Sequence, residues 1–74
     1  MMDHLEPIQR RLVRLGLAFA DDGEMAATVG CSLSTIRRHR ALAVAAVGAA
    51  DWRDLLRNAQ ADGIQPEPVV RSKR

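Results

Sequence analysis

The chain has 74 residues, a formal net charge of +2 and a single cysteine. It therefore forms no internal disulfide, and its few cysteine and histidine residues cannot complete a metal site, so we expect no metal and no other cofactor. A chain this short buries only about 60% of its unfolded surface, and we expect a homodimer to supply the missing burial. The sequence has no apolar run long enough to cross a membrane, its start does not resemble a signal peptide, and a free cysteine suits a reducing compartment. Together these features predict a cytoplasmic protein.

Helix-forming residues dominate the composition. The hydrophobic fraction is 47%, and much of it is alanine, which favours helix strongly but fills little volume. Phe19 and Trp52 are the aromatic residues, so the core must rest on leucine, isoleucine and valine from closely packed helices. Useful strand alternation is absent from the sequence. We predict an all-α fold, with a small four-helix domain over residues 1–63 and a basic, proline-containing tail over residues 64–74.

The first predicted helix begins at Pro7, because proline is tolerated at the first helical position. Its end falls between Leu15 and Ala20. Apolar residues recur along it at the spacing that is typical of a helix with one buried face. This stripe consists of Ile8, Leu12, Leu15 and Phe19.

A short second helix is predicted over residues 23–29. Asp21 marks its start, because an aspartate followed three residues later by Glu24 forms a capping box. The acidic side chains also suit the positive end of the helix dipole. Gly30 marks its end, since helices commonly terminate in a left-handed residue and glycine adopts that conformation without steric cost.

The third predicted helix has a basic surface. Ser32 or Ser34 caps its start, and Gly48 is the latest position at which it ends. Acidic residues are absent between Glu24 and Asp51, whereas three arginines fall inside this gap. These arginines are Arg37, Arg38 and Arg40.

The fourth predicted helix spans about residues 51–62, with Asp51 as its cap. Its apolar stripe fits either the core of the same chain or a dimer interface, and we favour the dimer interface because a small core does not need all of it. The residues of this stripe are Trp52, Leu55, Leu56 and Ala59. Pro66 and Pro68 forbid a regular helix beyond this point.

Three residues have the spacing that two helices joined by a tight turn require. Ala26 is small where the helices approach each other, and Gly30 supplies the positive φ that the turn needs. Ile36 then locks the pair by packing between them. The spacing therefore predicts two helices that meet through a turn at Gly30.

The stretch Val29–Arg38 resembles the common pattern of the prokaryotic helix-turn-helix family, and the resemblance spans roughly Asp22–Leu42. It implies that the third helix is a recognition helix whose N-terminal residues enter the major groove of DNA. The family usually has an apolar residue in place of His39, so either His39 is partly buried or Leu42 locks the helices instead. The resemblance places on the exposed face Ser32, Leu33, Ser34, Arg37 and Arg38.

The residue types in this segment suit contacts with DNA. A guanidinium group binds phosphate or guanine in a bidentate manner. Ser34 and Thr35 near the helix start can donate to phosphate, and Arg40 extends the basic cluster. Further contacts with the DNA backbone could come from the tail and from three arginines that we expect more often to be solvated. These are Arg10, Arg11 and Arg14.

The sequence thus predicts a homodimer that binds double-stranded DNA at a pseudo-palindromic site. The small size and the motif resemble compact transcriptional repressors of plasmids and phages. Titratable groups with catalytic spacing are lacking, so we expect neither an enzyme nor a small-molecule ligand. Two alternatives remain: an excisionase-like or terminase-like accessory factor on the same DNA-binding module, and a helical adaptor that binds another protein.

Overall fold

The computed structural model describes residues 2–69, which form four α-helices after a short 3-10 helix over Met2–His4. The α-helices are α1 (Pro7–Leu17), α2 (Asp22–Val29), α3 (Leu33–Val47) and α4 (Trp52–Ala61). Within residues 2–69 there is no strand, so the predicted all-α fold is confirmed. None of the described helices is long and apolar enough to cross a membrane.

Three helices begin at the polar residues that the sequence predicts as caps. The carboxylates of Asp21 and Asp51 each accept a hydrogen bond from the backbone N–H three residues later, at 2.7 and 2.8 Å. The hydroxyl of Ser32 accepts the corresponding bond at 3.2 Å, so Ser32 rather than Ser34 caps α3. The predicted helix boundaries are confirmed to within one residue, and α3 continues through its alanine-rich part to Val47.

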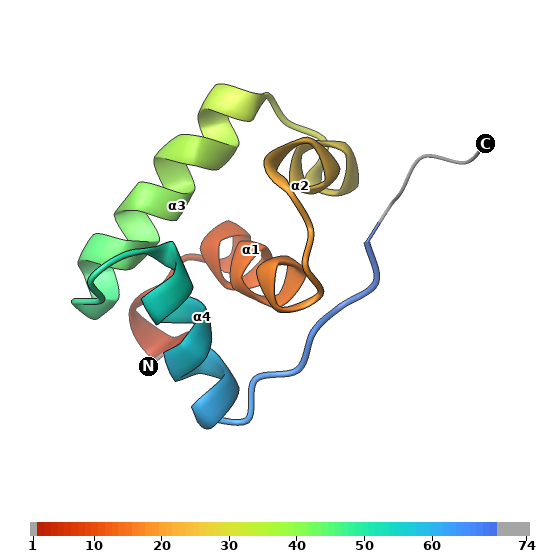
Figure 1. Cartoon of the computed structure of the whole chain (residues 1–74). Helices are drawn as coiled ribbons and strands as arrows, with labels where there is room; N and C mark the ends of the chain where they lie inside the picture. The colour runs from red at the N-terminus through yellow and green to blue at the C-terminus, as the bar shows by residue number, and fades with distance from the viewer. Residues whose placement is uncertain (1, 70–74) are drawn as a thin grey trace.

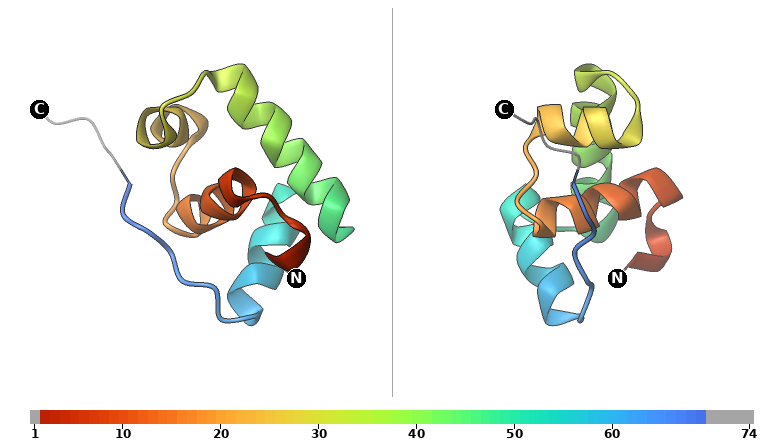
Figure 2. Two further views of the ribbon diagram at one scale, coloured as in Figure 1. Left: turned by 180° about the vertical axis from the view of Figure 1, so that it is seen from behind. Right: turned by 90° about the vertical axis from the view of Figure 1, so that its right-hand side faces the viewer.

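The other three helices surround α1 (Figures 1 and 2), and the core consists of two apolar clusters to which α1 contributes. The first cluster lies between α1, α3 and α4, and its buried members are Leu5, Val13, Ala43, Leu55 and Ala59. The second cluster lies between α1, α2 and α3, and its buried members are Leu12, Leu15, Met25 and Ile36. Because α1 contributes to both clusters, the other three helices all pack against it.

Phe19 does not belong to the buried stripe of α1, contrary to the sequence-based prediction. The helix ends at Leu17, and Phe19 adopts a φ of +66° with 89% of the residue exposed. The buried face of α1 instead includes Val13 and Gly16. The physical reason is that the chain must reverse direction here to start α2, which turns the side chain after the helix end away from the core.

The predicted dimer role of α4 is wrong for Leu55 and Ala59, which are fully buried inside the chain. Trp52 and Leu56 are half-buried and pack against the same cluster. This close packing depends on Gly16, because a Cβ atom there would lie only 2.9 Å from Leu56 Cδ2. The apolar face of α4 is therefore used mainly to cover α1.

Residues 64–69 have no regular helix, as the prolines predict, but they lie along α1 on the side away from α3 (Figures 1 and 2). Ile64 packs against the first cluster, and the backbone N–H of Glu67 donates to the carbonyl of Arg14 at 3.3 Å. The basic residues of the predicted tail lie outside the described residues. They are Arg71, Lys73 and Arg74.

Two glycines at opposite ends of α2 test the role of the turn. Gly30 has a φ of +84° and open space around it, so Gly30→Ala should destabilise the fold by backbone strain alone, by about 1–2 kcal/mol. Gly23 lies within the helix with an ordinary φ, so Gly23→Ala should be neutral or stabilising by up to about 1 kcal/mol. Urea unfolding followed by Trp52 fluorescence measures both. Equal stability of the two variants would contradict the left-handed turn.

Candidate nucleic-acid interface

The connection between α2 and α3 consists of Gly30, Cys31 and Ser32. The carbonyl of Ala26 accepts hydrogen bonds from the backbone N–H groups of Gly30 and Cys31, at 2.8 and 3.1 Å, which closes the end of α2. Ile36, one turn into α3, is fully buried against the second cluster. The conformation predicted at Gly30 and the burial predicted at Ile36 are confirmed, and Ala26 is half-buried against the same cluster.

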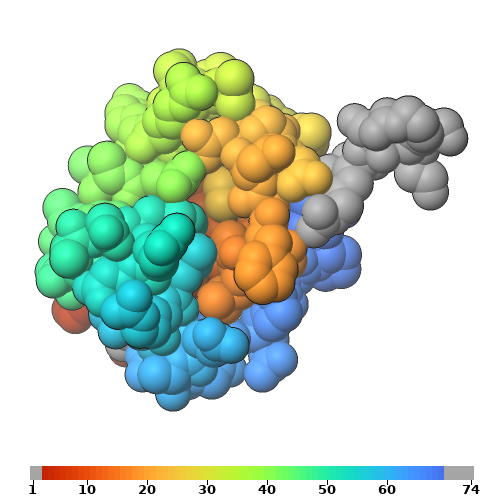
Figure 3. Space-filling view, viewed as in Figure 1, coloured from red at the N-terminus to blue at the C-terminus, as the bar shows by residue number. Residues whose placement is uncertain are grey.

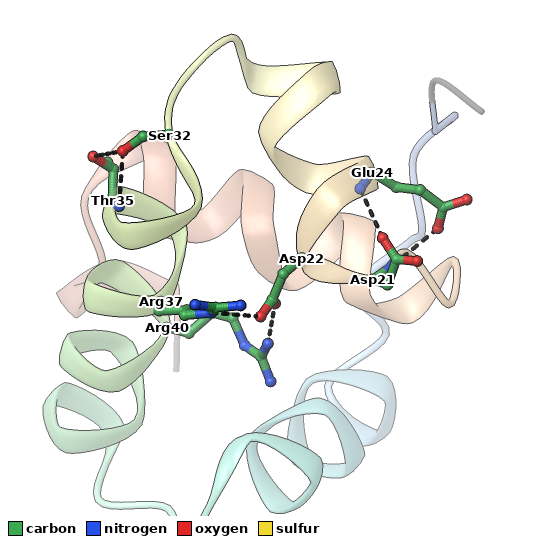
Figure 4. A network of polar contacts seen from close by, with 7 residues as sticks. All are labelled: Asp21, Asp22, Glu24, Ser32, Thr35, Arg37 and Arg40. Atoms are coloured by element: carbon green, nitrogen blue, oxygen red, sulfur yellow. Dashed lines mark hydrogen bonds and ion pairs between the residues drawn. The ribbon is translucent and has the colours of Figure 1, made fainter. Parts of the chain in front are cut away.

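The first two turns of α3 present an exposed surface. Ser34 and Arg38 are exposed, and Leu33 is 43% exposed despite its apolar side chain. Thr35 is half-buried, and its hydroxyl lies 2.9 Å from that of Ser32, beside the cap (Figure 4). The hydroxyl groups at this end of α3 thus gather around the helix start, where backbone N–H groups also point outward.

Two arginines on this surface are exposed. The side chain of Arg37 is 66% exposed, with its Nε 3.4 Å from Asp22. Arg38 is exposed, and within residues 2–69 it makes no hydrogen bond or ion pair. An exposed ion pair such as that of Arg37 contributes little stability and breaks easily. Both cations are therefore available to an anionic partner.

Arg40 differs from its neighbours, because its side chain is turned toward the interior. Its Nη1 lies against a carboxylate oxygen of Asp22, the first residue of α2 (Figure 4). Its guanidinium carbon lies 4.9 Å from the centre of the Trp52 ring, and only 29% of the side chain is exposed. Arg40 therefore ties α2, α3 and α4 together. Because it is engaged in these contacts, we no longer expect it to contact DNA, contrary to the sequence-based prediction.

The burial of His39 and Leu42 decides between the two alternatives that the sequence left open at position 39. His39 is half-buried, and its Nδ1 lies 3.3 Å from the amide nitrogen of the buried Gln9 on α1. Leu42 is 49% exposed, so the idea that it locks the helices is wrong. Ala43, two turns after Ile36 on the same face of α3, is fully buried, but it packs in the first cluster with α1 and α4.

The arginines of α1 are engaged on the far side of the molecule. Arg11 lies 2.9 Å from Glu67, and Arg14 Nε donates to the carbonyl of Gln65 at 3.1 Å. Arg10 donates to a backbone carbonyl of the N-terminal segment at 3.0 Å. Since residues 64–69 run along the side of α1 away from α3, these arginines do not extend the exposed surface of α3 (Figures 1 and 2).

Comparisons of the chain with protein-family models, with curated proteins and with solved structures find no match. Within residues 2–69 no group of three or more His, Cys, Asp or Glu side chains could hold a metal ion. The start of α3 thus presents two exposed arginines, several hydroxyl groups and one leucine. These groups suit a polyanionic partner with an apolar element on its surface.

Arg37 and Arg40 share the partner Asp22 but differ in burial, which makes them a matched pair. Arg40→Gln should lower the free energy of unfolding by about 1–2 kcal/mol, because it removes a partly buried ion pair and a cation–π contact. Arg37→Gln should change it by less than about 0.5 kcal/mol. Urea unfolding measures both, and an equal loss in the two variants would refute the structural role of Arg40.

Proposed function

We propose that this chain binds duplex DNA in a sequence-specific manner, with α2 and α3 acting as a helix-turn-helix. The observation that carries the proposal is the exposure of Arg38 beside Arg37 on the first turns of a helix whose other face is buried; within residues 2–69 Arg38 has no ion-pair partner. Ile36 anchors that buried face against α1 and α2. The exposed side chains are thus held on a rigid element, as base recognition requires.

The dimensions of α3 suit the major groove. Its 15 residues correspond to a length of about 22 Å, and the groove is about 12 Å wide, which admits one α-helix. The N-terminal end of α3 projects at the edge of the molecule, next to α2 (Figure 1). The first turns of α3 can therefore approach base edges while α2 lies across the DNA backbone.

The local charges favour DNA as the partner. Asp22 lies against the basic part of α3, and its carboxylate is paired with Arg40 and Arg37. Three arginines against one aspartate leave this side of α3 positive. We assign guanine or phosphate contacts to Arg37 and Arg38, phosphate contacts to the hydroxyls of Ser34 and Thr35, and an apolar contact with a base to Leu33.

We further propose that the protein acts as a homodimeric transcriptional repressor. A domain of this size gains little from its own core, which favours association. Two recognition helices about 34 Å apart would read a pseudo-palindromic operator in successive major grooves. Repression would follow from occupying a promoter.

Selection of binding sites from a random duplex pool, carried out at two salt concentrations, tests the proposal. We expect an enriched inverted repeat and an affinity that falls steeply as salt rises, because arginines displace counterions from the phosphates. Salt-sensitive binding without a motif would instead favour an architectural accessory factor. Failure to retain any duplex at low salt would refute DNA binding.

Arg38→Ala provides a residue-level test on the selected site. If Arg38 reads a base, the variant should lose about 1–3 kcal/mol of binding free energy and tolerate other bases at one position. Arg11→Ala is the control, because Arg11 is exposed on the side of α1 that faces residues 64–69. Equal losses in the two variants, measured by titration of fluorescent duplex, would show that α3 is not the reading surface.

A further inference from the structure

Phe19 combines two features that are unfavourable for an aromatic residue. It is 89% exposed, which makes it the most exposed of the large apolar residues in the described chain. It also has a φ of +66°, a conformation that residues with a side chain rarely adopt. Glycine would adopt this backbone conformation with less strain, so we looked for a contact that the aromatic ring could make.

Hydrogen bonds fix the backbone from which the ring of Phe19 projects. The N–H of Ala20 donates to the carbonyl of Leu15 at 3.1 Å, and the N–H of Phe19 donates to that of Gly16 at 2.9 Å. These two bonds form the Schellman motif that ends α1, with Phe19 at the position where glycine is usual. The backbone that carries the ring is therefore part of a closed, hydrogen-bonded turn.

An apolar groove of about 740 Å³ opens directly beside this ring. It lies between the end of α1, the face of α4 and residues 63–66, and Phe19 stands at its edge. On the face shown in Figure 3, the orange atoms of the α1–α2 connection and the teal atoms of α4 flank a recess. The apolar walls of the groove come from Gly16, Leu17, Trp52, Leu56, Ile64 and Pro66.

The charges around the ring and around the groove are opposite in sign. Asp21 is exposed and follows Phe19 by two residues. Arg53 and Arg57 line the groove, and within residues 2–69 Arg53 forms no ion pair. Guanidinium groups also stack favourably on aromatic rings. The protruding ring with its acidic neighbour thus matches the groove with its basic rim.

We propose that Phe19 of one copy inserts into the groove of a second copy, and that the two copies exchange rings about a two-fold axis. Because ring and groove lie side by side on one face, a single rotation satisfies both at once, as a self-complementary interface requires. In the same arrangement Asp21 of each copy approaches Arg53 of the other. The occupant of the groove is therefore a second copy of this chain.

The area involved is compatible with a stable dimer. An aromatic side chain buries about 150–250 Å². Specific interfaces bury about 1,200–2,000 Å² in total, of which two exchanged rings supply roughly a quarter. The groove walls that the rings cover, together with α4 and residues 63–66 around them, provide the remainder.

The position of the groove leaves α3 free to bind DNA. In all views the start of α3 lies at one end of the molecule, whereas the end of α4 and residues 62–66 lie at the other (Figures 1 and 2). Two copies joined through the groove would carry their recognition surfaces on the outside. The inference rests on the homodimer of the proposed function, but it does not depend on DNA binding.

Phe19→Gly tests the interface without threatening the fold. Glycine relieves the positive φ, so the unfolding midpoint of dilute monomer should rise, while the dimer dissociation constant should increase at least tenfold. Sedimentation equilibrium over a concentration series measures association, and thermal unfolding at low concentration measures stability. A wild-type chain that stays monomeric into the millimolar range, or a Phe19→Gly variant that remains dimeric, would overturn the proposal.

Two further variants sharpen this result. Leu42→Ala removes another exposed apolar side chain, on α3 and outside the groove, and should leave association unchanged. Arg53→Glu places an acid opposite Asp21 and should weaken association at least tenfold, an effect that high salt reduces. Weakening by Leu42→Ala equal to that of Phe19→Gly would show that the dimer uses another face.

Duplexes carrying one half-site or the full inverted repeat separate this inference from the proposed function. Phe19→Gly should bind the half-site as well as the wild-type chain does, and should lose the added affinity for the repeat. If neither the wild-type chain nor the variant binds duplex, while Phe19→Gly still abolishes the dimer, DNA binding is refuted and the proposed interface is supported. If the wild-type chain and the variant bind the repeat equally well as dimers, the proposed interface is refuted and DNA binding is supported.

Discussion

The structure depends on α1 being buried on two faces at once. Val13 points into the cluster shared with α3 and α4, whereas Leu12 and Leu15 point into the cluster shared with α2 and α3. Because α1 packs on both sides, it contacts all three of the other helices, and α3 likewise contacts α1, α2 and α4. Gly16 completes this arrangement, because its missing side chain lets α4 approach.

Helix geometry gives the arginines of α3 two different surroundings, one partly buried and one exposed. Arg40 follows Ile36 by one turn and therefore shares its inward direction, which brings the guanidinium group to Asp22 and Trp52. Arg37 and Arg38 point outward from the same helix. A cation that ties three helices together cannot also move to meet a ligand, so the exposed pair is what remains for the proposed contact with DNA.

The distribution of exposed apolar groups follows from the size of the chain. A domain of this length has more apolar residues than its interior can enclose, and some of them must remain on the surface. In the part of the chain that the structure describes, the large exposed ones are Leu33 and Leu42 on α3, and Phe19 beside the groove. We propose that Leu33 serves DNA recognition and that Phe19 serves self-association.

The local features of the chain were determined by the sequence itself. The caps at Asp21, Ser32 and Asp51, and the left-handed turn at Gly30, each depend on hydrogen bonds or steric limits within a few neighbouring residues. These interactions need no knowledge of the rest of the chain, which is why the helix bounds and most of the candidate surface could be predicted.

The tertiary structure decided which faces of the helices meet. It turned Arg40 inward, enclosed Leu55 and Ala59 within the chain, and left Phe19 exposed beside the groove. It also laid residues 64–69 along α1. Periodicity identifies an apolar stripe but not its partner, because the choice between core, groove and interface depends on contacts between residues far apart in the sequence.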